Sequence, residues 1–246
     1  MIIVASKYLK ARFTLLFSLI LILSIIFGGS FLWNMFSVSD VSSYVPKYTT
    51  VVIDAGHGGV DGGTCSENGI LEKHLNLQIA LKVNDFLKSM GINTVMIRTQ
   101  DISIHDKTAT TIREKKVSDI KNRLKIINET ENSIFVSIHQ NHFSQEKYHG
   151  SQIFYSKNNP ESSSLADYVR HSVISVLQPD NSRETKQSGS EIYLLYHAKT
   201  PSIMVECGFL SNHEETEKLT DENYQKKLAF LISLGVMDFI NNTEAG

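Results

Sequence analysis

Four side chains that lie far apart in the sequence are candidates for chemistry: His57, Glu72, His139 and Glu206. His57 stands in the glycine-rich segment Asp54–Gly59. His139 ends an apolar run, where a neutral imidazole without a polar partner is costly. Glu72 opens a helical pattern. Two imidazoles and one carboxylate, with a fourth position left open for water, are a ligand set of catalytic zinc sites.

Spacing alone leaves other interpretations open. The glycines around His57 could cradle a phosphate, but no Gly-Lys-Ser/Thr follows them and no strand–GxGxxG–helix unit is formed. Glu72 could simply favour a helix N-terminus through the helix dipole. Cys65 could be a thiolate ligand. Because the candidates lack the compact spacing of an H-E-x-x-H motif, their positions alone do not establish a metal site.

These candidates need strands and helices to bring them together. Short apolar runs predict strands at 51–53, 92–97, 134–138, 151–155 and 203–207, and apolar residues at spacings of three and four predict helices near 71–90, 111–128, 163–177 and 223–240. This alternation predicts an α/β fold: a single domain with a central twisted, mostly parallel sheet flanked by helices. The carboxyl ends of parallel strands meet at one edge, so the segments 54–59, 139–141 and 206–208 are expected to converge.

Side-chain alternation makes a further prediction for the last strand. Met204 and Glu206 should point to one face of the sheet, and Val205 and Cys207 to the other. Cys207 is therefore expected to be a small buried hydrophobic residue that faces away from the candidate site.

Weaker predictions concern the polar neighbours of the candidate ligands. His74 follows Glu72 by two residues, about 200° around the helix, so it should face elsewhere. Asp54 and Asn141 could orient the imidazoles through hydrogen bonds or could cap turns. Three polar residues that precede an expected strand at Tyr193 could line a substrate groove or form a solvated loop: Arg183, Lys186 and Gln187.

The N-terminal segment is distinct in composition. Three basic residues precede an apolar run from Phe13 to Trp33, whose 21 residues are close to the roughly 20 of a membrane-spanning helix. We expect residues 1–33 to be a signal anchor, with a cleavable signal peptide as the alternative. Residues 34–48 read as a linker and residues 49–246 as the catalytic domain, exported and extracytoplasmic, with membrane contact through the N-terminal segment.

Charge and cysteine content exclude other classes of protein. The chain of 246 residues has a net charge of −2, and without the three basic residues of 1–33 the remainder carries −5. No broad basic surface for nucleic acid is expected, so no nucleic-acid partner is predicted. Two cysteines rule out a disulfide scaffold.

Four motifs occur in a fixed order: VIDAGHGG at 52–59, EKHLNL at 72–77, SIHQN at 137–141 and VECGFLSN at 205–212. Together they resemble the zinc-dependent N-acetylmuramoyl-L-alanine amidases of the Amidase_3 type, from about Val51 to Ile240. The combination of an N-terminal anchor with one catalytic domain and no wall-binding repeats is most similar to the CwlD-type spore-cortex (germination) amidases.

This resemblance implies an activity and roles for the four candidates. His57, Glu72 and His139 would bind one Zn²⁺, and Glu206 would be the catalytic glutamate. The substrate would be peptidoglycan, cut at the amide between the lactyl group of N-acetylmuramic acid and L-alanine during spore cortex maturation or germination. The alternatives are a zinc carboxypeptidase acting on the stem peptide and a catalytically silent wall-binding module.

The segment after His139 bears on regulation. Some relatives are held inactive by a helix near the second histidine ligand, and such a helix needs about ten or more residues of its own. Here only the eleven residues 140–150 connect His139 to the next strand, and Asn141, His142, Ser144 and Gly150 give them the composition of a loop. We therefore expect an open site, with control by export or by a protein partner acting in trans.

Overall fold

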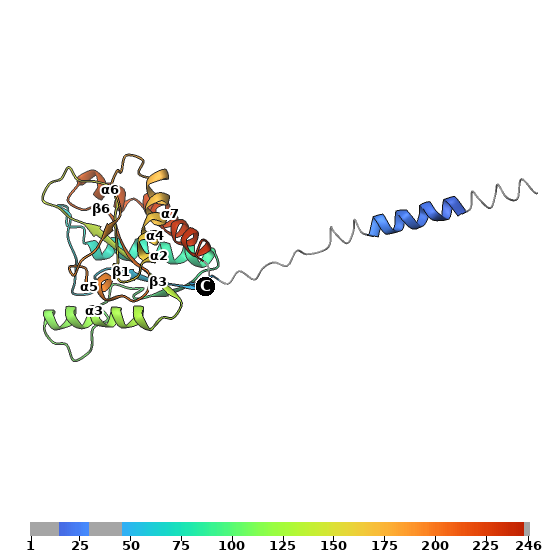
Figure 1. Cartoon of the computed structure of the whole chain (residues 1–246). Helices are drawn as coiled ribbons and strands as arrows, with labels where there is room; N and C mark the ends of the chain where they lie inside the picture. The colour runs from blue at the N-terminus through green and yellow to red at the C-terminus, as the bar shows by residue number, and fades with distance from the viewer. Residues whose placement is uncertain (1–14, 30–45, 244–246) are drawn as a thin grey trace, which may run out of the picture. The chain divides into compact units, whose positions relative to one another are not determined.

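The computed structural model describes residues 15–29 and 46–243 (Figure 1). Residues 15–29 form an exposed helix. The rest of the predicted anchor and residues 34–45 of the predicted linker lie outside the described residues. Within the described ranges, no helix combines the length and apolar character needed to cross a membrane.

A mixed sheet forms the centre of the compact unit built by residues 46–243. Its strands, in chain order, are β1 (Thr50–Ala55), β2 (Asn93–Met96), β3 (Ser133–Asn141), β4 (Gln152–Tyr155), β5 (Lys186–Gln187) and β6 (Ser202–Phe209). They lie side by side in the order β2-β1-β3-β6-β4-β5. Neighbouring strands run parallel, except that β4 is antiparallel to β6. The prediction of a mostly parallel α/β sheet is confirmed.

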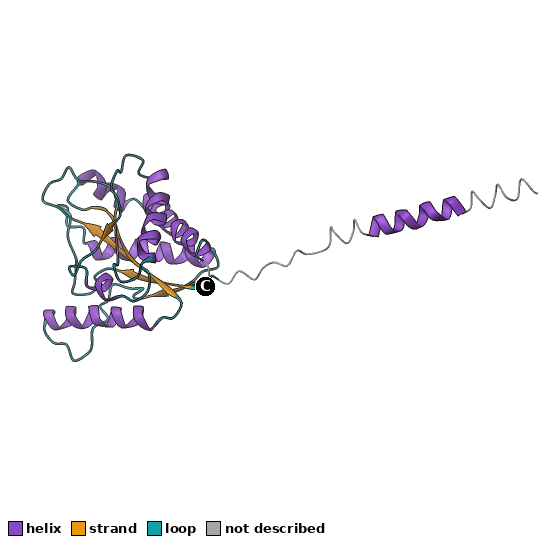
Figure 2. Cartoon of the chain, in the orientation of Figure 1, coloured by secondary structure: helices purple, strands orange, loops and turns teal. Residues whose placement is uncertain are grey.

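Helices cover both faces of this sheet (Figure 2). They are α2 (Glu72–Ser89), α3 (Ile112–Glu129), α4 (Glu161–Val176), α5 (Tyr193–His197), α6 (His213–Thr220) and α7 (Glu222–Asn241). One core cluster joins the sheet to α2, α4 and α7, and a second joins its other face to α3 and α5. Because both faces are covered, the central strands are continuous apolar runs rather than alternating ones.

The alternation predicted for β6 is confirmed. Val205 and Cys207 belong to the core cluster on the α2 side, whereas Met204 belongs to the cluster on the α3 side. Cys207 is fully buried, and burial raises the pKa of its thiol far above the ordinary range. It is therefore a core residue with no reactive thiolate.

The strand expected at Tyr193 is wrong, because this segment forms the short helix α5. Leu194 and Leu195 are both buried in the same core cluster. Consecutive residues of a strand would point to opposite faces of the sheet, so a helical turn is what lets both leucines face one core.

The connection from β3 to β4 contains no helix, as predicted. β3 extends to Asn141, and residues 142–151 form turns and bends. Gly150 has φ +82°, and a Cβ at this position would lie 2.8 Å from the side chain of Asn181. The glycine therefore lets the loop pass close to the neighbouring segment.

Candidate metal centre

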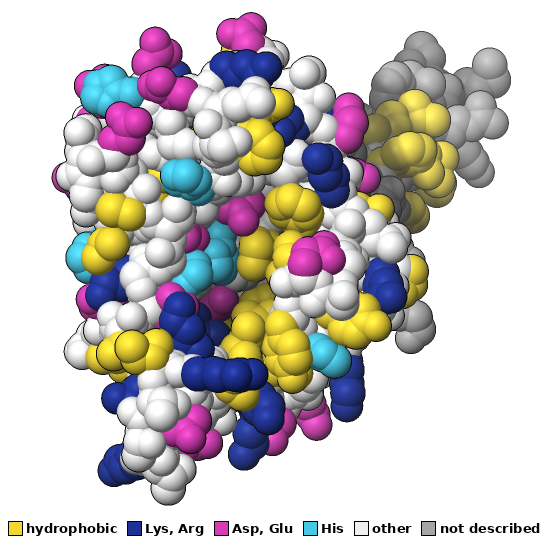
Figure 3. Space-filling model, turned by 90° about the vertical axis from the view of Figure 1, so that its left-hand side faces the viewer, with side chains coloured by type: hydrophobic (Ala, Val, Ile, Leu, Met, Phe, Trp, Pro, Cys, Tyr) yellow, Lys and Arg dark blue, Asp and Glu magenta, His cyan; other side chains and the backbone are white. Residues whose placement is uncertain are grey.

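The sheet brings the predicted ligands together at the carboxyl ends of its strands. His57 follows β1 by two residues, His139 lies near the end of β3, and Glu72 is the first residue of α2. One ligand atom from each of the three lies within 4.8 Å of the others. Figure 3 shows histidine side chains within a hollow of this face, next to charged and hydrophobic ones.

Both imidazoles contact the Glu72 carboxylate. His57 Nε2 lies 3.2 Å from Glu72 Oε2, and His139 Nδ1 lies 2.9 Å from Glu72 Oε1. A Cβ at Gly56 would lie 2.2 Å from His139 Nε2, and one at Gly63 would lie 2.5 Å from Glu72 Oε2. The two glycines thus leave room for this close approach. Two imidazoles and a carboxylate arranged in this way fit a zinc ion.

Glu72 is held as an ionised carboxylate. Burial alone would raise its pKa, but hydrogen bonds from His139 and His57 lower the pKa well below its ordinary value. The backbone N–H of Thr64 donates to Oε2 at 2.8 Å, and Asn76 Nδ2 donates to Oε1 at 3.2 Å. A deprotonated carboxylate is the form that binds a metal ion.

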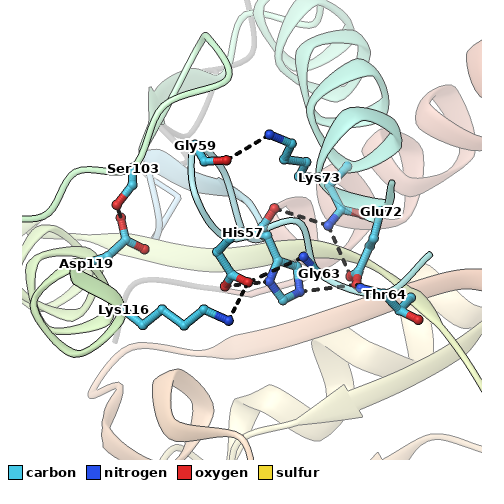
Figure 4. Close-up of polar contacts among 12 residues, drawn as sticks. His57, Gly59, Gly63, Thr64, Glu72, Lys73, Ser103, Lys116 and Asp119 are labelled. Atoms are coloured by element: carbon cyan, nitrogen blue, oxygen red, sulfur yellow. Dashed lines mark hydrogen bonds and ion pairs between the residues drawn. The ribbon is translucent and has the colours of Figure 1, made fainter. Parts of the chain in front are cut away.

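Asp61 orients the ring of His57, a role that the sequence reasoning did not assign. Its Oδ2 lies 2.9 Å from His57 Nδ1, and Lys116 Nζ lies 2.8 Å from its other oxygen. In Figure 4, Lys116 lies on the side of His57 that is opposite Glu72, where it contacts the Asp61 carboxylate. A carboxylate on one ring nitrogen fixes the orientation of the other, which here faces Glu72. Asp61 and Asn76 each follow a candidate ligand by four residues, and that spacing is the signal that could have identified them.

Two buried arginines fasten the loop that carries His57. Arg98 donates to the carbonyl oxygens of Ala55 at 2.7 Å and Gly56 at 2.9 Å. Arg123 donates to the carbonyl oxygen of His57 at 2.6 Å. His57 itself has φ +61°, a conformation that is costly for a residue other than glycine. These charge-assisted bonds stabilise the loop in that conformation.

Asp54 takes part in this fastening rather than in orienting an imidazole. Its carboxylate pairs with the Arg123 guanidinium and accepts a hydrogen bond from Ser137 Oγ. Burial by itself raises the pKa of Asp54, but the charge of Arg123 outweighs it and the pKa lies below its ordinary value. Arg123 also pairs with Asp119 at 2.7 Å.

We expect Arg123→Met to destabilise the fold by about 3–5 kcal/mol, because it leaves two acidic side chains without their buried partner. Arg113→Met is the matched control, since Arg113 lies exposed on the same helix. Denaturant unfolding followed by circular dichroism measures the difference. Equal midpoints for the two variants would contradict a structural role for Arg123.

Glu206 lies beside the ligands with a free carboxylate oxygen. It pairs in register with His139 across β3 and β6, so both side chains share one face of the sheet. Its Oε2 is buried and has no hydrogen-bond partner among the described residues. Burial raises the pKa of Glu206 to about 7. A carboxyl group of this pKa can both accept and return a proton near neutral pH.

The other polar residues considered from the sequence lie outside the ligand cluster. His74 faces away from the cluster and lies 3.4 Å from Asp101, as expected. Cys65 is exposed, its Sγ contacts the carbonyl oxygen of Ser66, and it does not belong to the cluster. Asn141 ends β3 and pairs with Phe209 in the sheet. Lys186 and Gln187 form the exposed strand β5.

A cleft of about 310 Å³ adjoins the two histidines on the side of α3 and α5. Its lining includes Lys116, Asp119, Arg123, Glu191 and Tyr193. These residues present charged and aromatic side chains to a ligand beside the cluster.

Comparison with known proteins now decides the family. Residues 51–238 match the Amidase_3 family model, described as N-acetylmuramoyl-L-alanine amidase. The chain belongs to this family. The amidase is 32% identical over 196 residues to the germination-specific N-acetylmuramoyl-L-alanine amidase of Bacillus subtilis, covering 80% of this chain and 81% of that protein.

Solved structures agree with this assignment. The CwlD amidase of Clostridioides difficile, solved in complex with the GerS lipoprotein, is 38% identical with a TM-score of 0.76, covering 78% of this amidase and 98% of that chain. A second N-acetylmuramoyl-L-alanine amidase, from Clostridium difficile 630, is 31% identical with a TM-score of 0.69, covering 80% and 98%. This amidase is therefore an enzyme that hydrolyses the amide between N-acetylmuramic acid and L-alanine.

Proposed function

We propose that this amidase binds one zinc ion through His57, Glu72 and His139 and uses Glu206 to transfer protons during hydrolysis of peptidoglycan. The observation that carries the proposal is the convergence of three ligand atoms within 4.8 Å beside a buried carboxylate oxygen of Glu206 that has no hydrogen-bond partner in the described part of the chain. The family that residues 51–238 match is described as N-acetylmuramoyl-L-alanine amidase, an activity that such a site would serve.

The residues divide the reaction between them. A zinc ion held there would supply a Lewis acid for the amide carbonyl and would lower the pKa of water to about 7. Glu206 accepts the proton that the attacking water loses and returns it to the alanine nitrogen as the C–N bond breaks, because an amine leaves poorly as an anion. Asp61 and Asn76 keep His57 and Glu72 in place throughout.

We further propose that residues 1–33 direct the domain out of the cytoplasm and anchor it to the membrane, with 34–48 as the tether. The three basic residues before the apolar run from Phe13 to Trp33 support this orientation. The substrate, peptidoglycan, is met on that side of the membrane.

We infer the cellular role from the proteins to which this chain is similar. The similarity to the germination-specific amidase and to CwlD supports action on the spore cortex. CwlD was solved with a lipoprotein, which supports a protein partner in trans for this chain as well. The open β3–β4 loop, which carries no helix, leaves control to export or to such a partner.

Mass analysis of a peptidoglycan digest tests the activity. The purified full-length chain should release free peptides that begin with L-alanine and leave glycan strands intact. A zinc carboxypeptidase would instead shorten the stem peptides while they remain attached to the sugar, and a silent binding module would release nothing. Either of these results would contradict the proposal.

A further inference from the structure

Aromatic side chains gather where β3 and β6 run into the loops that follow them. The ring centroids of Phe143 and Tyr148 lie 4.9 Å apart with their planes at 86°, and those of Tyr148 and Phe209 lie 6.3 Å apart. The Arg183 guanidinium lies over Tyr148 and Phe209, at 5.7 and 4.8 Å from their centroids. We call these four side chains the aromatic ledge.

The aromatic ledge follows the same two strands that carry His139 and Glu206. The register pairs His139 with Glu206 and, beyond an irregularity that adds one residue to β6, Asn141 with Phe209. A strand advances about 3.3 Å per residue, so the backbone of Phe209 lies within about 10 Å of Glu206. Phe143 follows Asn141 by two residues.

The loop that carries the ledge is fastened although it has no regular secondary structure. The backbone N–H of Phe143 donates to Ser211 Oγ at 3.0 Å, and Asn212 Nδ2 donates to the carbonyl oxygen of Glu146 at 2.7 Å. Phe143 nevertheless remains 47% exposed. The surface of Phe143 is therefore accessible to a ligand that lies at the end of the two strands.

The chemistry of the reaction indicates which ligand. The lactyl group at the scissile amide is attached to a sugar, so a pyranose ring must lie close to the metal centre. One face of a pyranose ring presents C–H groups, which pack on the electron-rich face of an aromatic ring. Lys147 and Arg183 lie over the ring of Tyr148, so the exposed surface of Phe143 is the part of the ledge that a sugar ring would contact.

We propose that the aromatic ledge binds a sugar ring of the glycan strand and thereby makes the enzyme prefer substrates that carry the sugar. This inference rests on the proposed amidase function and adds to it the residues that recognise the glycan. From the sequence, Arg183 could line a substrate groove or belong to a solvated loop. In this subsite its guanidinium lies over the rings of Tyr148 and Phe209.

The test compares two substrates with the full-length enzyme: a muramyl disaccharide bearing a stem peptide, and the same stem peptide carrying only the lactyl group. The ratio measured is kcat/KM for the disaccharide substrate divided by kcat/KM for the lactyl-peptide. Phe143→Ala should lower this ratio about three- to tenfold, mainly by raising KM for the disaccharide substrate. Phe143→Tyr, which keeps the ring, should restore the ratio.

Phe230→Ala is the matched control. Phe230 is 42% exposed and forms a similar edge-to-face pair with Phe86, with centroids 5.4 Å apart, but it lies on α7. If Phe143→Ala and Phe230→Ala give the same ratio as the unmodified enzyme, the proposal is wrong. An aromatic ledge that serves a protein partner alone would give that same result.

A binding measurement separates this proposal from the proposed function. Peptide-free glycan strands are titrated into the enzyme carrying Glu206→Gln, with and without Phe143→Ala, so that no cleavage is needed. Three- to tenfold weaker binding in the double variant would support the aromatic ledge even if the cleaved bond were a different one. Equal binding would overturn it.

Discussion

Replacing Glu206 by glutamine is expected to lower kcat by about 10²- to 10⁴-fold while the protein stays folded. Glutamine has nearly the same shape, but its amide neither accepts a proton from water nor returns one to the alanine nitrogen. The free, buried Oε2 of Glu206 and its position opposite His139 are the basis for this expectation. Initial rates of peptide release from purified peptidoglycan measure the effect.

The control for this experiment is Glu222→Gln, a change of the same chemistry at an exposed position on α7. Zinc content and the unfolding midpoint are measured for both variants. A Glu206→Gln enzyme that retains full turnover would show that the glutamate is structural. The proton would then have to be carried by another group.

Replacing His139 by alanine is expected to abolish zinc binding, with the bound metal falling from one ion per chain to near zero. Two protein ligands hold zinc poorly, and the carboxylate of Glu72 would also lose its contact with the imidazole at 2.9 Å. Elemental analysis of the protein after dialysis against zinc-free buffer measures the metal directly, independently of activity.

His74→Ala provides the comparison for this loss. His74 lies two residues from Glu72 but faces Asp101 and is not part of the ligand cluster. It should therefore retain one zinc ion per chain. Full zinc occupancy in the His139→Ala variant would remove His139 from the site and leave the ligand set to be reassigned.

The sequence predicted the candidate ligands and the class of fold. A buried parallel strand has to be a short apolar run, and a helix packed on a sheet has to repeat its apolar residues every three or four positions, so both patterns are readable without coordinates. His57, His139 and Glu206 follow or end such runs. Their positions at the ends of these runs predict that they lie at one edge of the sheet.

Tertiary structure alone decided which groups support those ligands. Asp61, Asn76 and the buried guanidinium of Arg123 act through contacts whose partners depend on how the helices cross the sheet, and Arg123 reaches Asp54 across 69 positions of sequence. The aromatic ledge likewise depends on the register that sets Asn141 opposite Phe209. Periodicity reports which face of an element is buried, but a side chain's partner is fixed only when the elements are packed, because many partners are equally compatible with the same pattern.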